Sequence, residues 1–539
     1  TGYYALAQID CTRKDYDSAL EHIDIAIIKN YHNCNARNLK ASILRKTKDY
    51  KSAELTAIET IKIDQLDFWS RNELYLLALE LDEQKKKDKL SKQLRQLMRG
   101  DARNYISLAV DYSMSGLFKE GIDILSRFLS FDENEREIYP MIYYYLGYYY
   151  RKINEMEKSR ACYHLGACAK SLYCFPNTLE DILVLQNVIE NNPKDSKAYY
   201  YLGNLWYDKK QYVQAINCFE KSAVIDDSFP TVHRNLALAY FNKMDKPQKA
   251  RQSLERAFKL DPTDARVFLE LDQLYKKLNI SYKKRLENFQ GNTQLVEIRD
   301  DLYIEYITLL NLCAQYDRAN DLISKRKFHP WEGGEGKVTK QYVYSHVEIS
   351  KKYLKNRLFK EAIVELEKAQ IYPENLGEGK LRGAQENDID YFMGIALEGL
   401  GESEKSKEYY LKASVGLDEP SSAMFYNDQP PEMIFYQGAA LLKVDKIADA
   451  KDKFNKLIDY GKNHLDDNIT IDYFAVSLPD FLIFDDDLNK KNNIHCHYLM
   501  GLGYLGLKNR EMAKDELSEV MRLDVNHQGG LVHLKMINF

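Results

Sequence analysis

A 34-residue period in the middle of the chain decides its fold. Residues 199–226 read "YYYLGNLWYDKKQYVQAINCFEKSAVID", and residues 233–262 read "HRNLALAYFNKMDKPQKARQSLERAFKLDP". Positions 34 residues apart carry side chains of the same size class: Leu202 with Leu236, Gly203 with Ala237, and Trp206 with Tyr240. A fixed period of this length, with helical spacing of apolar residues inside it, predicts a repeated pair of antiparallel helices.

The residue sizes explain how each predicted pair packs. A small residue such as Gly203 or Ala237 is expected where the two helices approach most closely, and large residues such as Phe219 are expected to fill the groove to the next helix. The order of Leu, Gly or Ala, Tyr, then Ala, Phe, Ala and Pro resembles the tetratricopeptide repeat. That resemblance implies a solenoid of helical hairpins whose concave face is the natural surface for a protein partner.

The same residue classes recur along most of the chain. Matching pairs include Leu6 with Ala7, Leu108 with Ala109, Leu146 with Gly147, Met393 with Gly394, and Met500 with Gly501. We predict an all-α fold, a right-handed α-solenoid of about eleven tetratricopeptide-type hairpins, several of them degenerate. At 68–100 and 264–300 the frame lapses, although both stretches still look helical.

Long connections interrupt the predicted hairpins in the second half of the chain. We expect N-terminal hairpins, a central block with the most regular repeats, and C-terminal repeats that carry inserted loops. The predicted ranges are 1–170, 171–300 and 301–539, with loops at 328–338, 372–392 and 462–492.

Composition and charge exclude several functions. The net charge is −5 from 76 basic and 81 acidic residues, so no whole-molecule field attracts nucleic acid or an anionic membrane. No apolar run approaches the roughly 20 residues of a membrane-spanning helix. The eight cysteines include no Cys-x-x-Cys, so we predict neither a zinc ribbon nor a disulfide framework, and no metal or cofactor. Asp485, Asp486 and Asp487 lack the pattern of a calcium loop and are expected to cap the following helix.

Two loops share the sequence Gly-Glu-Gly-Lys, at 334–337 and 377–380. Lys337 and Lys380 lie 43 residues apart, which is one repeat plus nine loop residues, so the two loops are expected at the same edge of the solenoid in neighbouring layers. Neither loop has the leading Gly, the trailing Ser or Thr, or the preceding strand of a nucleotide-binding loop, so we reject nucleotide hydrolysis.

Two interpretations of the loop pair stay open. The glycines either adopt left-handed helix caps with their charges facing water, or they free backbone amides that hold a carboxylate, a phosphate or a sugar hydroxyl. For the second interpretation Trp331 would stack on a sugar ring, Glu332, Glu335 or Glu378 would act as acid or base, and the lysines would anchor the ligand. The candidate ligand-binding residues are His329, Trp331, Glu332, Glu335, Lys337, Asn375, Glu378, Lys380 and Arg382.

Several stretches together resemble a wider bacterial family. They include "CFPNTLEDILVLQ", "FPTVHRNLALAY", "FHPWEGGEGKV", "YPENLGEGKL" and "DYFAVSLPDFLIFDDDL". In that family of large proteins a β-rich, aldose-mutarotase-like domain of unknown function precedes a long tetratricopeptide array. The resemblance implies that a β-rich domain lies upstream of this chain, and an action on carbohydrate is one role that it implies for that domain.

These observations favour a scaffold over an enzyme. We predict a non-catalytic tetratricopeptide scaffold, a fragment of a larger protein, that binds another protein or its own upstream domain. The alternative is that the two loops form part of a carbohydrate-binding or carbohydrate-processing site completed by the upstream domain. The unpaired-looking cysteines favour the cytoplasm, and a periplasmic location stays open because the chain begins without Met and already inside a helical pattern.

Overall fold

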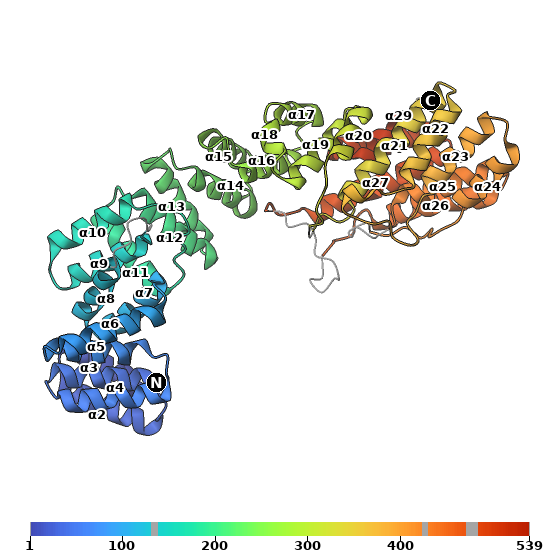
Figure 1. The fold of residues 1–539 in the computed structure, drawn as a ribbon. Coiled ribbons are helices and arrows are strands. Elements are labelled where there is room, and N and C mark those ends of the chain that lie inside the picture. Colours follow the sequence, from blue (N-terminus) through green and yellow to red (C-terminus); the bar gives the residue numbers. More distant parts are fainter. Residues whose placement is uncertain (1, 131–137, 332, 423–428, 471–482, 538–539) are drawn as a thin grey trace. The chain divides into compact units, whose positions relative to one another are not determined.

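The computed structural model describes residues 2–130, 138–331, 333–422, 429–470 and 483–537 (Figure 1). These residues form 29 α-helices, one short 3-10 helix and no strand, which confirms the all-α solenoid. The chain divides into unit 1, Thr1–Val232, and unit 2, His233–Phe539. The predicted division at 170 and 300 stays a prediction.

Unit 1 consists of helices packed mainly as consecutive antiparallel pairs (Figure 1). Its helices are α1 Gly2–Arg13, α2 Tyr16–Lys29, α3 Cys34–Lys46, α4 Tyr50–Ile63, α5 Phe68–Glu80, α6 Gln84–Met98, α7 Ala102–Ser113, α8 Phe118–Ser130, α9 Pro140–Lys152, α10 Met156–Cys168, α11 Leu179–Asn191, α12 Ser196–Asp208 and α13 Tyr212–Ile225. Helix α11 stands between two pairs and has no second helix of its own. Helix α14, Pro230–Met244, crosses the division between the units.

Unit 2 continues the same construction. Its helices are α15 Pro247–Leu260, α16 Ala265–Lys277, α17 Tyr282–Gln290, α18 Thr293–Val296, α19 Asp300–Leu312, α20 Tyr316–Lys325, α21 Lys337–Lys355, α22 Phe359–Ala369, the 3-10 helix η1 Glu374–Leu376, α23 Asn387–Gly399, α24 Ser403–Ala413, α25 Pro431–Lys443, α26 Ile447–His464, α27 Leu488–Gly506, α28 Arg510–Leu523 and α29 Gln528–Met536. The capping role predicted for the three aspartates is confirmed for Asp487, whose carboxylate accepts a hydrogen bond from Lys490 N. Asp485 pairs with Lys243 and Asp486 with Lys277 instead.

The predicted packing of small against large residues is confirmed. Where the first helix of a pair carries glycine, a side chain there would start 2.3–2.7 Å from the residue sixteen positions later in the second helix. The facing pairs are Gly147 with Tyr163, Gly203 with Phe219, Gly394 with Tyr410, Gly438 with Phe454, and Gly501 with Leu517. A Cβ essentially never approaches another atom this closely, so only glycine lets these facing side chains pack against the first helix.

The turns inside the hairpins show that the 34-residue frame continues where the sequence suggested a lapse. The first four turns each place one residue in the left-handed region, 34 residues apart: Lys14, Lys48, Asp82 and Gly116. The prediction of a lapse at 68–100 is therefore wrong, because α5 and α6 form a hairpin with its turn at Asp82. At 264–300 it is partly right. Helix α16 and the left-handed Asn279 keep the frame, but the second helix is replaced by the short α17 and α18.

Candidate functional site

The two Gly-Glu-Gly-Lys loops lie in direct contact, as their spacing predicts. The backbone N–H of Phe328 donates to Asn375 O at 2.8 Å, and a side chain at Gly377 would start 2.7 Å from Phe328 O. Gly336 and Gly377 both have positive φ, +72° and +78°, which favours glycine at these positions. The left-handed caps expected in the first interpretation are therefore present.

An internal carboxylate occupies the place where an external anion was expected. Both oxygens of Glu378 lie 3.0 Å from the backbone N of Gly336, the N-cap residue of α21, and Thr339 Oγ1 lies 3.4 Å from Glu378 Oε2. A helix N-terminus attracts negative charge, and here the neighbouring loop supplies it. Glu378 thus fastens one loop to the other.

Other candidate residues also have partners inside the protein. Asn375 donates its amide to Ile323 O and Arg326 O at 2.8 and 2.9 Å, and Lys380 contacts Gln370 O at 3.0 Å and pairs with Glu386. Trp331 is half-buried, covers Gly334 and packs on the hydrophobic cluster around α19. These contacts hold the loops in place.

The remaining candidates lie at the surface. The backbone N–H of His329 donates a hydrogen bond to the Asp300 carboxylate at 3.1 Å, and the His329 side chain is 80% exposed. Glu335, Lys337 and Arg382 are exposed. Glu332 lies outside the described residues. The ligand-binding role of these residues stays a prediction.

The Glu378 contact gives a first testable prediction. Glu378→Gln keeps the shape of the side chain but turns a charged acceptor into an amide, so we expect a local loss of about 1–3 kcal/mol at the α21 N-terminus. Hydrogen exchange at Gly336 to Thr339 should speed up, with little change in the thermal stability of the whole chain. Glu335→Gln, an exposed charge loss in the other loop, is the matched control. Unchanged exchange at Gly336 in the Glu378 variant would show that the loops are held together by other contacts.

A cavity of about 350 Å³ lies beside the loop pair. Its lining comes from α20, α21 and the second loop, and consists of Asn320, Asp321, Ile323, Ser324, Tyr342, His346, Pro373 and Asn375. His346 Nδ1 faces Glu365 Oε2 at 2.6 Å, and burial lowers the pKa of His346. Ser324 donates its hydroxyl to Asp321 O at 2.9 Å, so it is not aimed at this imidazole. The residues that line the cavity therefore do not assemble a nucleophile with a base.

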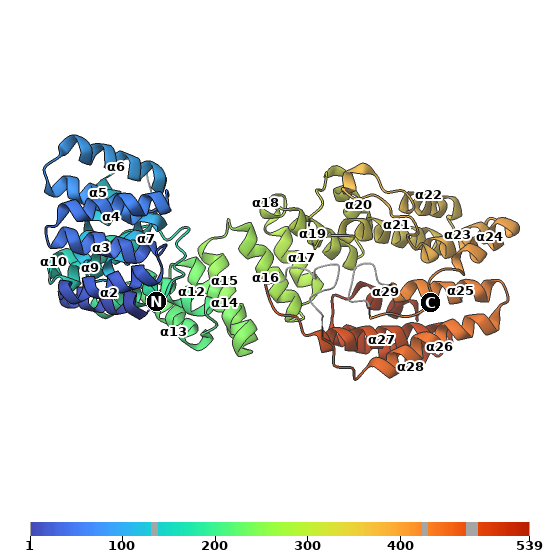
Figure 2. The ribbon, with the colours of Figure 1, turned by 90° about the horizontal axis from the view of Figure 1, so that it is seen from below.

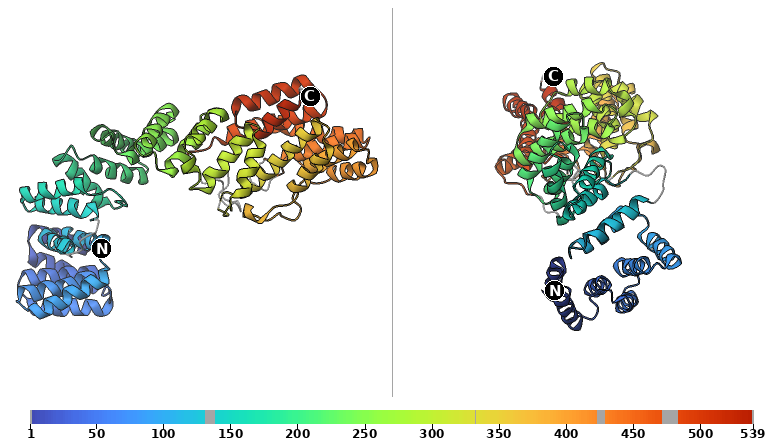
Figure 3. Two further views of the ribbon diagram at one scale, coloured as in Figure 1. Left: turned by 45° about the horizontal axis from the view of Figure 1, so that its top comes forward. Right: turned by 90° about the vertical axis from the view of Figure 1, so that its left-hand side faces the viewer.

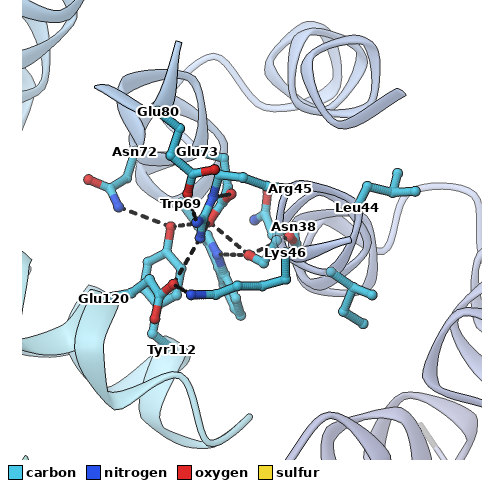
Figure 4. Close-up of polar contacts among 12 residues, drawn as sticks. Asn38, Leu44, Arg45, Lys46, Trp69, Asn72, Glu73, Glu80, Tyr112 and Glu120 are labelled. Carbon is cyan, nitrogen blue, oxygen red and sulfur yellow. Dashed lines mark hydrogen bonds and ion pairs between the residues drawn. The ribbon is translucent and has the colours of Figure 1, made fainter. Parts of the chain in front are cut away.

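Buried polar side chains link α3, α5, α7 and α8 in unit 1 (Figure 4). Arg45 on α3 donates to Glu73 on α5 at 2.7 Å, to Glu80 at 2.7 Å and to Glu120 on α8 at 3.1 Å. Tyr112 on α7 donates to Glu73 at 2.6 Å. Glu73 is completely buried and Arg45 is 2% exposed. The first helices of the second, third and fourth hairpins thus bond to each other through buried side chains.

Helix α29 packs mainly on α28 in unit 2, whose C-terminal helices are the red ribbons of Figures 2 and 3. Its side chains also reach α25 and α27 through His533, and α21 through Gln528. Among the described residues of α29 only Lys535 is exposed. Sequence reasoning missed the contact between α29 and α21 because Gln341 and Gln528 lie 187 positions apart, and no local pattern predicts such a contact.

An exposed apolar surface lies at the start of α11. Five large side chains within twelve residues are more than half exposed: Leu172 64%, Tyr173 83%, Phe175 56%, Leu179 68% and Leu183 58%. We call these five residues the α11 apolar surface. Leu179 and Leu183 lie one helical turn apart on the same face. A sequence reading could have found this surface, since both leucines fall on the face of α11 opposite its buried Val184, Leu185 and Val188.

The backbone beneath this surface is fixed. Thr178 and Asp181 form a reciprocal cap at the start of α11, and the Asp181 carboxylate also accepts hydrogen bonds from Asn177 N at 2.9 Å and Tyr145 OH at 2.8 Å. Cys174, inside the loop, is buried. The apolar side chains are therefore presented to solvent by an ordered support.

Two further searches concern membranes and metals. No helix among the described residues is long and apolar enough to cross a membrane. Within the same residues, no three His, Cys, Asp or Glu side chains gather in an arrangement that could hold a metal ion.

Comparison with known proteins identifies the repeat. Residues 196–229 and 233–264 each match a family model described as tetratricopeptide repeat. Similar solved structures include yeast Tom70, at 12% identity over 94% of this chain and 95% of that one with a TM-score of 0.28, and the Cut9–Hcn1 hetero-tetramer of APC/C, at 13% over 98% and 95% with 0.26. YrrB, titled a TPR protein with an unusual peptide-binding site, matches at 15% over 46% and 95% with 0.18. The fold assignment rests on the hairpins and the two matched repeats: the chain carries tetratricopeptide repeats.

Proposed function

We propose that this chain is a non-catalytic scaffold that binds another protein, or a further domain of its own polypeptide, through the α11 apolar surface. Tetratricopeptide hairpins fit protein–protein interaction. The observation that carries the proposal is the exposure of Leu172, Tyr173, Phe175, Leu179 and Leu183 on an ordered support. Contiguous exposed apolar side chains of this size mark interaction sites.

The burial of the polar network in unit 1 favours this location. Arg45, Glu73 and Tyr112 bond to one another and are buried, so a partner would have to break a buried ion pair to reach them. At the α11 surface a partner displaces only water from leucine and aromatic side chains, which is favourable. Because the cap at Thr178 already orders the backbone, little conformational entropy remains to be lost on binding.

Variants at the α11 surface test the proposal. Leu179→Gln combined with Leu183→Gln removes the apolar contact while keeping good helix formers. Losing two buried leucines from an interface costs about 3 kcal/mol or more, which corresponds to a roughly 100-fold weaker partner interaction. The measurement is cross-linked co-purification with quantitative mass spectrometry, comparing the variant with the parent chain.

The control is Val213→Gln combined with Val224→Gln, which changes two exposed valines on α13 in the same unit. We expect a protein that is retained by the parent chain and by the control and is lost with the α11 variant. If all three chains retain the same proteins in the same amounts, the α11 surface is not the binding site. Circular dichroism checks that all three are equally helical.

The carbohydrate alternative has no observation in its favour. Asn375, Glu378 and Lys380 are engaged in holding the loops together.

A further inference from the structure

Residues 483–486, just before α27, dock on helices from the other end of unit 2. The Asn242 side chain on α14 donates to Ile483 O at 2.7 Å and accepts a hydrogen bond from Asp485 N at 2.9 Å. These partners lie 241 and 243 positions apart in the sequence. One amide side chain thus satisfies the backbone of this segment at two points. We call residues 483–486 the strap.

The side chains of the strap add an apolar anchor and two ion pairs. Phe484 is 1% exposed, and its ring packs edge-on against a phenylalanine ring of α14. Asp485 pairs with Lys243 on α14 at 3.2 Å, and Asp486 pairs with Lys277 on α16. The strap is therefore held by one buried ring and by acidic side chains that face basic ones.

A second contact joins the same two parts of unit 2. Asn279, directly after the α16 helix, donates to Arg522 O at 3.0 Å and accepts a hydrogen bond from Val525 N at 2.8 Å. Arg285 on α17 donates to the Asn526 side chain at 2.9 Å. We call the strap contact and this second contact together the clasp. The clasp connects α14, α16 and α17 with the segments that precede α27 and follow α28.

The clasp is mostly polar, whereas the parts that it joins have apolar cores of their own. One buried apolar cluster runs from α16 to α21, and another runs from α21 to α28. Leu531 of α29 adds one apolar contact to the first cluster. Each hairpin of a solenoid is stabilised mainly by its neighbours along the chain. The clasp can therefore open while the hairpins on both sides keep their cores.

We propose that the clasp is a releasable lock between two forms of unit 2. In the closed form the strap is docked on α14 and α16, and in the open form both contacts of the clasp are broken while every hairpin stays folded. The open form exposes the ring of Phe484 and the parts of α14 and α16 that the strap covers. The clasp thus controls access to these surfaces without a change of fold. It is separate from the α11 apolar surface, so either proposal can fail alone.

Two backbone amides report the two contacts of the clasp. Asp485 N is bonded to Asn242, and Val525 N is bonded to Asn279. The test is Asn242→Ala in the full chain, with hydrogen exchange read at single residues. Asp485 loses its acceptor in this variant, so the informative amide is Val525, whose acceptor is unchanged. We expect Val525 to exchange at least about fivefold faster than in the parent chain, because the strap loses two hydrogen bonds and the clasp opens as a unit.

The amides inside α14, α16 and α27 should stay as protected as in the parent chain. The matched control is Asn455→Ala, at an exposed position of α26 in the same unit, which should leave Val525 unchanged. The proposal is overturned if Val525 exchanges at the parent rate in the Asn242 variant, because the two contacts then open separately. Loss of protection in α16 and α27 together with Val525 would also overturn it, because the opening is then unfolding.

A covalent lock tests the same proposal in the opposite direction. Lys277 and Asp486 are in contact, so a carbodiimide can join them through an amide bond. In the linked parent chain, identified by mass spectrometry, Val525 should exchange more slowly than in the unlinked chain. Lys277→Met cannot form this link, and the same treatment should not slow exchange at Val525 in that variant. An unchanged rate at Val525 in the linked parent chain would contradict the proposed coupling of the two contacts.

Discussion

Arg45→Met is expected to lower the free energy of unfolding of unit 1 by about 3–5 kcal/mol. The substitution keeps a long side chain but removes the charge that faces Glu73, Glu80 and Glu120. Glu73 is completely buried and would keep only hydrogen bonds from neutral groups, Ser42 and Tyr112. An unpaired carboxylate in such a place costs far more than an exposed ion pair contributes.

The measurement is urea unfolding followed by hydrogen-exchange mass spectrometry of the peptides from α3 to α8. Arg13→Met, a change at an exposed position on α1, is the matched control and should shift stability little. Adding Glu73→Gln to Arg45→Met should recover part of the loss, because the uncompensated charge is then gone. A loss below 1 kcal/mol, with no recovery in the double variant, would mean that water or a rearranged side chain already solvates the network.

Gly438→Val is expected to destabilise unit 2 by about 3 kcal/mol, at the upper end of overpacking changes. A side chain at this position would start 2.5 Å from the ring of Phe454, which is 1% exposed and has no free volume to move into. The helices α25 and α26 must therefore separate. Chemical unfolding can be followed through Trp331, the one tryptophan in the sequence of unit 2.

The control is Gly291→Ala in the same unit. Gly291 has a right-handed helical φ of −75°, and the nearest atoms to an added methyl are 3.6 Å away, so alanine should be neutral or stabilise by up to about 1 kcal/mol. Phe454→Leu added to Gly438→Val should restore part of the stability by shortening the facing side chain. Equal effects of the valine and alanine variants would contradict the proposed close packing of glycine against the ring.

The hairpin packing and the loop contact could be predicted from sequence because both follow from spacing. The small residue and the large residue that face each other, such as Gly203 and Phe219, lie sixteen residues apart in the sequence of a repeat. The distance from Lys337 to Lys380 is one repeat plus a loop. Local periodicity is enough for such features. It also implied a concave surface for a partner, and that expectation stays a prediction.

The buried polar network of unit 1 and the contacts of α29 could not be predicted in the same way. The contacts from Arg45 to Glu120 and from Gln341 to Gln528 join residues 75 and 187 positions apart, and they depend on how sharply the hairpins curve. Asn72 and Glu73, in the stretch 68–100 where the sequence suggested a lapse, are completely buried polar residues. Their partners on α3 and α7 explain them.

The two loops show a similar limit. Their sequence suggested a ligand-binding site with Trp331, Glu378 and Lys380. In the structure Glu378 accepts a hydrogen bond from Gly336 N, and Lys380 forms an ion pair with Glu386. A Gly-Glu-Gly-Lys segment supplies both the backbone amides and a carboxylate, so two such loops can satisfy each other. Sequence alone does not distinguish this internal pairing from the binding of an external anion.

Hydroxyl radical footprinting of the full chain tests the central claim, that the polar network of unit 1 and the contacts of α29 are buried while the α11 apolar surface is exposed. We expect Tyr173 and Phe175 to be oxidised rapidly, and Trp69, Tyr112, Tyr498 and His533 to be modified slowly, because the former are exposed and the latter are buried. Rapid modification of Tyr112, Tyr498 and His533, together with protection of Tyr173 and Phe175, would contradict it.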